Sequence, residues 1–251
     1  TAIIEPGWLD ALLNHAQRPE VGAVGAKLLH PDGTVQHAGV VLGLRGPAEH
    51  PFLGEAMDAH GTMQRLRVDQ NYSALTAACL MVRKSLYQEV GGLDEGDFKV
   101  SYNDVDLCLK LAAAGYLNVW TPHALVMHEG SASQKLVDAG EVDSRKERFA
   151  AEKDALYAKW LPQIARDPAY NPNLSLRGKG FEYEARSDLV WHPLAWRPSP
   201  VALAHMADRW GCGHYRVIQP FEAMREAGQI EGLLTDAALL PSELVRLDPD
   251  V

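Results

Sequence analysis

The stretch SYNDVDLCLKLAAAGYLNVWTPHALVMHEGSAS, residues 101–133, decides the fold class of this chain. Apolar residues recur at helical spacing from Asp104 to Ala114, and Gly115 follows as a residue suited to end a helix. Two runs of strand-forming residues come next, separated by Pro122. A helix that leads directly into extended segments indicates an α/β fold in which the two kinds of element pack on each other.

Three polar residues open the helix, namely Asn103, Asp104 and Asp106. The positive end of the helix dipole favours carboxylates in the first turn, and Ser101 with Asp104 matches the pattern of a capping box. A carboxylate at a helix start, directly after a loop, is also well placed to act as a general base. The residues alone leave both roles open. The face that turns inward is predicted to hold Val105, Cys108, Leu109 and Ala112.

A single histidine, His128, ends the apolar run ALVM and precedes the small residues of EGSAS. A lone histidine is more often a packed or surface residue than a ligand. At the end of a strand, however, its ring can lie beside an anion or a metal ion. Both roles stay open at this point.

The residues before this stretch continue the alternation of helix and strand. A Pro-Asp-Gly turn at 31–33 predicts a hairpin, and the loop at 44–70 is long enough to suggest a functional loop. After residue 143, a charged amphipathic helix presents a solvated face rather than a basic patch. The other predicted elements are strands at 1–4, 21–29 and 75–82, and helices at 6–17, from 83 to Gly91-Gly92, and 144–162.

Composition excludes several classes of protein. The 251 residues include 24 Lys and Arg against 33 Asp and Glu, a net charge of −9 that argues against binding nucleic acid through a basic face. Three cysteines, few and odd in number, fit reduced thiols rather than a disulfide framework. No apolar run approaches the roughly 20 residues that a transmembrane helix needs.

The C-terminal third changes in character. Residues 167–200 are rich in proline and aromatic residues, which predicts a closing segment and linker between residues 1–166 and a second α/β unit at 201–251. That unit reads as strand, glycine turn, helix and strand. Because some 50 residues bury little surface, we expect this unit either to lean on the first part or to be incomplete.

Several motifs, in order, give the chain a close resemblance to the second half of a family-2 glycosyltransferase domain with the GT-A, Rossmann-like fold. The resemblance is greatest to bacterial enzymes that build cell-surface polysaccharide or O-antigen, and it covers roughly residues 1–180. The motifs are GWLDALL (7–13), VGAVGAKLLHPDGTVQHAGVVLG (21–43), NYSALTAACLMVRKSLYQEVGGLDE (71–95), NDVDLCLKLAAAGY (103–116), TPHALVMHEGSAS (121–133) and DPAYNPNLSL (167–176).

The resemblance implies roles for matched positions. Asp104 matches the catalytic base, which takes the proton of the acceptor hydroxyl, and His128 matches a late histidine that helps to hold a divalent metal, Mg²⁺ or Mn²⁺. Asn103 stands where the family commonly has Glu, and Lys110 where it commonly has Arg. Positions expected to contact the substrate are Thr76, Ala77, Asn103, Asp106 and Ser131.

The implied reaction is an inverting transfer of sugar from a nucleotide-diphospho-sugar to a glycan or a lipid-linked acceptor, in the cytoplasm or at the inner face of the cell membrane. The family's Asp-x-Asp motif normally precedes a stretch like TAIIEPGW, which here is residues 1–8. We therefore expect the chain to be a segment of a longer enzyme and to transfer no sugar by itself. Residues 208–228, DRWGCGHYRVIQPFEAMREAG, resemble the first glycine-rich turn of a GT-B-type glycosyltransferase module.

Three alternatives remain. The chain could be a non-catalytic carbohydrate-binding or scaffold segment, in which Asp104 and His128 need not converge. A calcium loop at residues 94–106 lacks the glycine and glutamate at the positions that an EF-hand requires. A zinc hydrolase would need closely spaced ligands, and neither H-E-x-x-H nor C-x-x-C occurs in the sequence.

Overall fold

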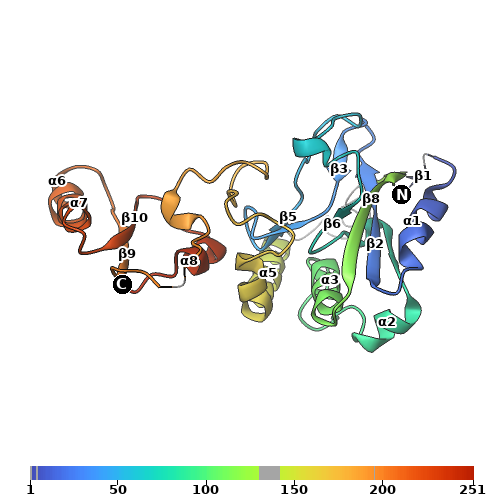
Figure 1. The fold of residues 1–251 in the computed structure, drawn as a ribbon. Coiled ribbons are helices and arrows are strands. Elements are labelled where there is room, and N and C mark those ends of the chain that lie inside the picture. The colour runs from blue at the N-terminus through green and yellow to red at the C-terminus, as the bar shows by residue number, and fades with distance from the viewer. Residues whose placement is uncertain (1, 4, 130–141, 195) are drawn as a thin grey trace.

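The computed structural model describes residues 2–3, 5–129, 142–194 and 196–251. Figure 1 shows a larger N-terminal part built around a sheet and a smaller C-terminal part, with α5 and α8 where the two meet. The strands are β1 (Ala2–Ile3), β2 (Val21–Leu29), β3 (Val35–His37), β4 (Val41–Leu42), β5 (Ala48–Glu49), β6 (Gln70–Asn71), β7 (Leu80–Val82), β8 (Leu117–Met127), β9 (Val201–His205) and β10 (Glu231–Thr235). The helices are α1 (Trp8–Ala16), α2 (Lys84–Glu89), α3 (Asn103–Ala113), α5 (Val142–Ala165), α6 (Gly211–Gly213), α7 (Gln219–Glu226) and α8 (Pro241–Leu247).

Two parallel strands, β2 and β8, form the centre of the main sheet. In the described part of the chain, six strands make up this sheet: β1 and β6 pair antiparallel with β8, while β3 and β7 pair antiparallel with β2. A parallel pair needs a crossover connection, and α3 provides the last step of it by leading directly into β8. The fold is therefore mixed α/β, as the sequence predicts.

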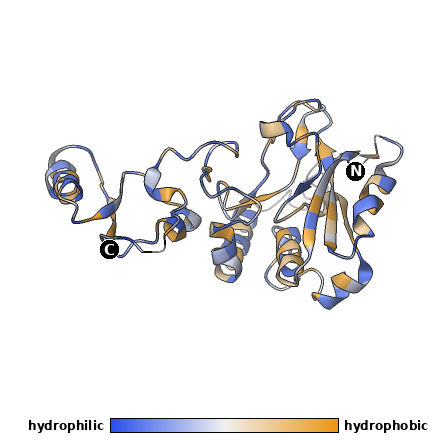
Figure 2. Ribbon diagram, in the orientation of Figure 1, coloured by the Kyte–Doolittle hydropathy of each residue, from blue (hydrophilic) through white to orange (hydrophobic). Residues whose placement is uncertain are grey.

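Every residue of β2 is buried, because helices or loops cover both faces of the strand. Val24, Ala26 and Leu28 pack with Leu12 of α1 on one face. Ala23 and Leu29 belong to the larger core on the other face, together with the apolar residues of α3. From Ala23 to Leu29 the two faces alternate with the period of two that a strand requires, and Figure 2 shows hydrophobic colour concentrated on these central strands.

Several sequence predictions are confirmed. The Pro-Asp-Gly turn joins β2 to β3 as an antiparallel hairpin, and Gly115 follows α3 with a positive φ of 91°. The two extended runs predicted on either side of Pro122 are instead one strand, β8, although its pairing with β2 jumps from Thr121 to Leu125. Proline has no amide hydrogen to donate to a ladder, which explains the interruption.

The predicted buried strand at 75–82 is wrong over its first half. Residues Ala77–Cys79 form a 3₁₀ turn, and the strand is only Leu80–Val82, half-buried at the edge of β2. The hydroxyl of Thr76 accepts a bond from the amide of Ala78 at 3.4 Å. This local bond competes with a strand ladder, which is why the β-forming composition does not decide the conformation here.

The predicted capping box at the start of α3 is also wrong. The residue before the helix is Tyr102, with a left-handed φ of 62°, and its side chain makes no capping bond. The amide of Ser101 donates instead to the carboxylate of Glu152 on α5, at 2.6 Å. The inward face differs as well, since Ala112 is exposed and Asp106 is fully buried.

The C-terminal part has the predicted order of strand, glycine turn, helix and strand, with β9 parallel to β10. It packs on the first part, as expected: α8 lies against α5, and Arg246 Nε donates to the carbonyl of Ala165 at 2.9 Å. Helix α5 runs past the predicted end at residue 162, through Pro162, with a kink at Trp160. Within the described ranges, no helix combines the length and the apolar composition needed to cross a bilayer.

Candidate functional site

Asp104 lies in the first turn of α3 and is half-buried. Its Oδ2 accepts a bond from the amide of Ala77 at 3.0 Å, and its Oδ1 accepts one from the amide of Val105 at 2.9 Å. A carboxylate has about four lone-pair positions, so these two bonds leave it able to accept a further hydrogen bond or a proton. Backbone amides thus fix the orientation of Asp104 while one side of it stays open.

The structure brings three of the predicted site residues together. The 3₁₀ turn at Ala77–Cys79 begins after Thr76, and its first amide is the one that binds Asp104. The 3₁₀ turn, which stands where the sequence predicts a strand, therefore brings the 71–95 motif into contact with α3.

Asp104 also lies at the edge of the sheet where such folds bind ligands. Leu80 pairs with Gly25 and β7 runs antiparallel to β2, so the residues just before Leu80 extend toward the carboxyl end of β2. His128 directly follows β8, which is parallel to β2, and so reaches the same edge. In open α/β sheets, ligands bind outside the carboxyl ends of the parallel strands.

Asp106, two residues further along α3, has a different environment. Its side chain is fully buried, Oδ1 lies 2.8 Å from Nζ of Lys159, and Oδ1 accepts a bond from the indole of Trp160 at 2.8 Å. Nζ of Lys110 lies 3.1 Å from Oδ2. Helices α3 and α5 enclose this carboxylate. The geometry therefore does not support the direct substrate contact that the resemblance implies for Asp106. It ties the two helices together behind Asp104.

His128 lies against the β2–β3 hairpin. Its amide donates to the carbonyl of Leu29 at 2.9 Å, and its own carbonyl accepts from Gln36 at 3.1 Å. Burial lowers the pKa of the His128 imidazole, and the nearby His30 lowers it further. Its ring is therefore neutral near pH 7, which is the state that a metal ligand requires.

The remaining predicted positions are Asn103, the first residue of α3, which is half-buried, and Ser131, which lies outside the described residues. The structure does not test whether Asn103 contacts a substrate. Both positions stay predictions.

The sequence analysis missed a histidine pair close to Asp104. Nδ1 of His37 and Nδ1 of His50 are 2.9 Å apart, and the amide of Gly39 donates to Nε2 of His37 at 3.4 Å. This arrangement assigns the proton of His37 to Nδ1, from which it is donated to His50. Burial lowers the pKa of both rings, while Glu49 and Asp104 act in the opposite direction on His50. The motifs QHAGV and EHPF contain these residues, but nothing in their spacing signals the contact.

The described residues do not by themselves form the Mg²⁺ or Mn²⁺ site that the resemblance implies. Among them, no group of three or more His, Cys, Asp or Glu side chains is placed to hold a metal ion. His128 offers a single nitrogen, and Mg²⁺ prefers oxygen ligands. We therefore derive no reaction step through a metal.

The chain is similar in sequence to several bacterial proteins. The chain is 48% identical to the uncharacterized protein y4gI of Sinorhizobium fredii over 179 residues, which are 71% of this chain and 19% of that protein. It is 42% identical to the O-antigen biosynthesis protein RfbC of Myxococcus xanthus over 178 residues, 69% of this chain and 13% of that protein. It is 36% identical to the N-acetylglucosaminyl-diphospho-decaprenol L-rhamnosyltransferase of Mycobacterium tuberculosis over 132 residues, 49% of this chain and 42% of that protein.

The chain thus spans less than half the length of each of these relatives. No family model matches the chain. The similarity covers up to 71% of the chain, and two of the three relatives are named for O-antigen biosynthesis or for sugar transfer.

Proposed function

We propose that this chain is part of an inverting glycosyltransferase that moves a sugar from a nucleotide-diphospho-sugar to a hydroxyl group of a glycan or lipid-linked acceptor. The names of the relatives support glycosyl transfer in polysaccharide assembly. The observation that carries the mechanism is the position of Asp104, held by the amide of Ala77 at the carboxyl edge of β2 and β8.

In this proposal the carboxylate of Asp104 accepts the proton of the acceptor hydroxyl as that oxygen attacks the anomeric carbon. The new bond joins the acceptor oxygen to the anomeric carbon. The bond from that carbon to the diphosphate oxygen breaks, and the nucleoside diphosphate leaves with the electron pair. A single displacement from the face opposite the leaving group inverts the anomeric configuration. General-base catalysis of this kind typically contributes about 10²–10⁴-fold to the rate.

Other residues of the chain position this base. The amide of Ala77 donates a hydrogen bond to this carboxyl group, and the start of α3 presents the positive end of the helix dipole to it. The buried Asp106 with Lys159 fixes α3 on α5, so the angle at which Asp104 leaves the helix is determined by the core. Thr76 precedes Ala77 and Asn103 precedes Asp104 in the sequence, and these are the positions from which we expect the sugars to be contacted.

The direct test is a screen of nucleotide-sugars with a protein that carries this chain, scored by acceptor-dependent release of nucleoside diphosphate. We expect release with one donor and a product whose anomeric configuration is opposite to that of the donor. A product with retained configuration contradicts the single displacement. Binding of glycans without any release, over the full set of donors, favours the non-catalytic carbohydrate-binding alternative.

A further inference from the structure

The pair of histidines, His37 and His50, has no role in the proposed transfer reaction, although it lies close to the candidate base. Nδ1 of His37 is 2.9 Å from Nδ1 of His50, and Nε2 of His37 accepts from the amide of Gly39 at 3.4 Å. His37 therefore carries its proton on Nδ1 and donates it to His50. Because Nδ1 of His50 accepts this bond, the neutral His50 ring carries its own proton on Nε2. The N–H groups of Gly39, His37 and His50 thus form one chain that ends at Nε2 of His50.

The Nε2–H group at the end of this chain can donate to a ligand. His50 is half-buried, and the carbonyl of Gly39 lies near its ring on a side that favours protonation. In the described part of the chain, however, no atom forms a hydrogen bond of ordinary length with Nε2 of His50. This nitrogen is also not one of the buried polar atoms that lack a partner, so solvent reaches it. A bound molecule can therefore replace water at Nε2 without breaking a bond within the protein.

Glu49 and His50, at the end of β5, are neighbours of the residues that start α3. Burial lowers the pKa of His50, and the charges of Glu49 and Asp104 act against burial. Burial also raises the pKa of the Tyr102 phenol to about 12, and the charge of Glu49 adds to this rise. The interaction of two charges falls with their separation and is screened by salt beyond about 8–10 Å. The His50 ring and the Asp104 carboxylate are therefore close in space, although 54 positions separate them in the sequence.

The backbone fixes the histidine pair beside the segment that holds the candidate base. The amide of Val40 donates to the carbonyl of Ala74 at 3.0 Å, and Ala74 lies three residues before Ala77, whose amide binds the base. Gly39 has a φ of 92°, and a Cβ atom at this position would lie 2.3 Å from the ring of Tyr72. Glycine is therefore needed at this position for the two segments to come so close.

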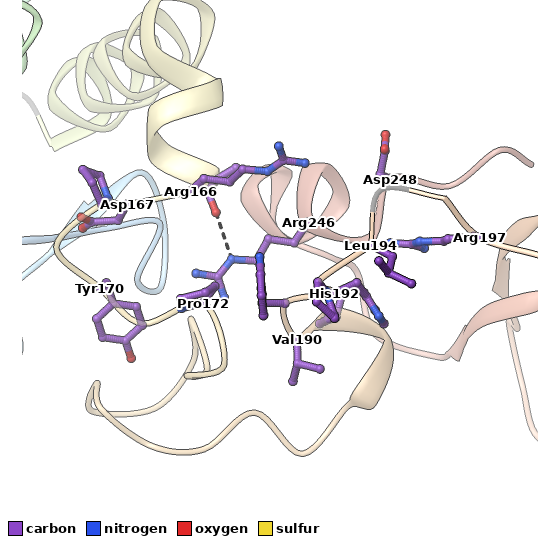
Figure 3. Close-up of a pocket in the computed structure, with 15 residues that line it drawn as sticks. Arg166, Asp167, Tyr170, Pro172, Val190, His192, Leu194, Arg197, Arg246 and Asp248 are labelled. Carbon is purple, nitrogen blue, oxygen red and sulfur yellow. Dashed lines mark hydrogen bonds between the residues drawn. The ribbon is translucent and has the colours of Figure 1, made fainter.

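Asp167, which lines the cavity drawn in Figure 3, connects the same two segments a second time. Its buried carboxylate accepts from the amide of Leu42 at 2.8 Å and from the hydroxyl of Ser73. Leu42 lies five residues after His37, and Ser73 lies four residues before Ala77. The strand that carries His37 and the segment that carries Ala77 are therefore held together at two points.

Strained backbone lies next to both His50 and Asp104. Arg45, Phe52 and Tyr102 have left-handed φ values of 52°, 62° and 62°. Arg45 and Phe52 lie on either side of His50 in the chain, and Tyr102 comes two residues before Asp104. A residue with a side chain keeps this conformation only where the surrounding contacts impose it, and such residues cluster at binding and active sites. The strain therefore agrees with a functional use of the space between His50 and Asp104.

A carboxylate and an imidazole N–H together are complementary to a pair of hydroxyl groups. An ionised carboxylate only accepts hydrogen bonds, the Nε2–H group of His50 only donates, and a hydroxyl group does both. On a sugar ring, one hydroxyl group can therefore give its hydrogen to Asp104 while the hydroxyl group next to it accepts from His50. Two contacts of opposite polarity hold the ring in one orientation, so the reacting oxygen stays beside the base.

We propose that His50 is a second substrate-contacting residue of this site, which donates from Nε2 to the acceptor hydroxyl group next to the one that reacts. His37 is a positioning residue that holds His50 in the tautomer this contact requires. The inference rests on the function proposed for Asp104. It makes His50 a determinant of acceptor specificity, because an acceptor that lacks the neighbouring hydroxyl group leaves a donor of the site without its partner.

The test measures transfer by a protein that carries this chain, with octyl glycosides of glucose, galactose, N-acetylglucosamine and rhamnose as acceptors. His50→Phe keeps a ring and removes the donor, whereas His50→Gln keeps an N–H group near the position of Nε2. For His50→Phe we expect kcat/KM for the acceptor to fall at least about tenfold with KM for the donor unchanged, and for His50→Gln a fall of about threefold or less. His192→Phe, at an exposed position outside the candidate site, is the matched control and should keep full activity.

Monodeoxy derivatives of the same acceptors identify the contact. One of them should lose about tenfold in kcat/KM with the unsubstituted protein and lose nothing further with His50→Phe, because that substitution has already removed the partner. Losses from deoxygenation and from His50→Phe that multiply in full for every derivative contradict the contact.

The tautomers are measured without a substrate. Long-range ¹⁵N–¹H NMR spectra of the protein labelled with ¹⁵N-histidine report which ring nitrogen carries the proton, and His50→Gln assigns the signals. We expect a protonated Nδ1 in His37 and a protonated Nε2 in His50. A proton on Nδ1 of His50, or unchanged acceptor kinetics in His50→Phe, overturns the inference. Failure of the proposed function is a different result, namely normal turnover by Asp104→Asn or no transfer from any donor.

Discussion

Two buried carboxylates, Asp106 and Glu243, each link separate segments of the chain through ion pairs, in two different regions of the molecule. Each is 1% exposed or less, and each is neutralised by two cationic side chains. Asp106 joins α3 to α5 through Lys110 and Lys159, within the part that holds the candidate site. Glu243 joins α8 to the segment 177–186 through two arginines, near the junction between the two parts of the chain.

The difference lies in the cations. The lysines present point charges to Asp106, and one of them, Lys110, lies 3.1 Å from an oxygen that receives no hydrogen bond. Arg177 donates to Glu243 from both Nε and Nη2, so that pair has the two-pronged geometry that guanidinium groups make possible. The amide of Leu240 adds a further bond to Glu243. Asp106 therefore relies on two nearby lysines and a bond from the Trp160 indole, whereas Glu243 is held by a two-pronged guanidinium and a backbone amide.

The largest effect is expected from Asp106→Asn, which leaves two lysines beside a buried neutral amide. Breaking a buried ion pair by removing one partner typically costs 3–5 kcal/mol, and because Lys159 is partly exposed we expect about 3 kcal/mol of unfolding free energy. Urea denaturation measures it. The control is Asp154→Asn, an exposed carboxylate on α5, which should change stability by less than about 0.5 kcal/mol. A loss as small as that of the control would show that the ion pairs do not hold α3 on α5.

Glu243→Gln should cost less, about 2 kcal/mol, because the side chain of Arg177 is 40% exposed and water solvates its charge when the carboxylate is removed. The loss is expected to be local, so amide hydrogen exchange should rise in α8 and in residues 174–189 while β2 stays protected. Glu222→Gln, at an exposed position on α7, is the matched control. Exchange that rises equally in β2 would mean that the junction and the sheet unfold together.

The same carboxylate predicts an acid transition. Burial alone would raise the pKa of Glu243, but bonds from Arg177, Leu240 and Arg186 outweigh it and lower the pKa to about 2. A carboxylate with a lowered folded-state pKa contributes stability that is complete above its unfolded value near 4.5 and is lost as the pH falls toward 2. Exchange in α8 should therefore rise below pH 4.5. In Glu243→Gln this dependence should disappear; its persistence would assign it to another group.

The smallest effect concerns the histidine pair. Burial lowers the pKa of both His37 and His50 below the unfolded value of 6.5. The unfolded chain then binds more protons, so stability falls as the pH drops below about 6.5, in a window above that of Glu243. Thermal melts between pH 7.5 and 5 measure the slope. His50→Gln, which keeps a side chain able to hydrogen-bond, should flatten it, and an unchanged slope would exclude the pair as its source.

Local patterns in the sequence predict much of the fold. The continuous apolar run of β2, the Pro-Asp-Gly hairpin and the glycine after α3 each carry their own structural signal, and the structure confirms them. The order of elements after residue 200 is confirmed for the same reason. Where propensity and pattern agree, tertiary contacts need only select a conformation that the chain already favours.

Contacts between distant segments could not be predicted in the same way. A pattern of acids at a helix start does not distinguish Asp104, which binds Ala77, from Asp106, which is sealed under Lys159. The sequence around Asp167 also gives no sign that this carboxylate accepts a hydrogen bond from the hydroxyl of Ser73, 94 residues away. The environment of each carboxylate depends on which cations and donors other segments of the fold place beside it. Helical periodicity alone therefore predicted that Ala112 faces the core, whereas Asp106 is the buried residue.

The most direct test of the central claim, that Asp104 is the base of a sugar transfer, is the rate of transfer by Asp104→Asn in a protein that carries this chain. Asn keeps the size and the acceptor oxygen for the amide of Ala77 but cannot take a proton near pH 7, so we expect a loss of at least about 10²-fold in kcat with donor affinity unchanged. Asp97→Asn, an exposed carboxylate in the preceding loop, should retain full activity. Turnover by Asp104→Asn within about twofold of the unsubstituted protein would contradict the account.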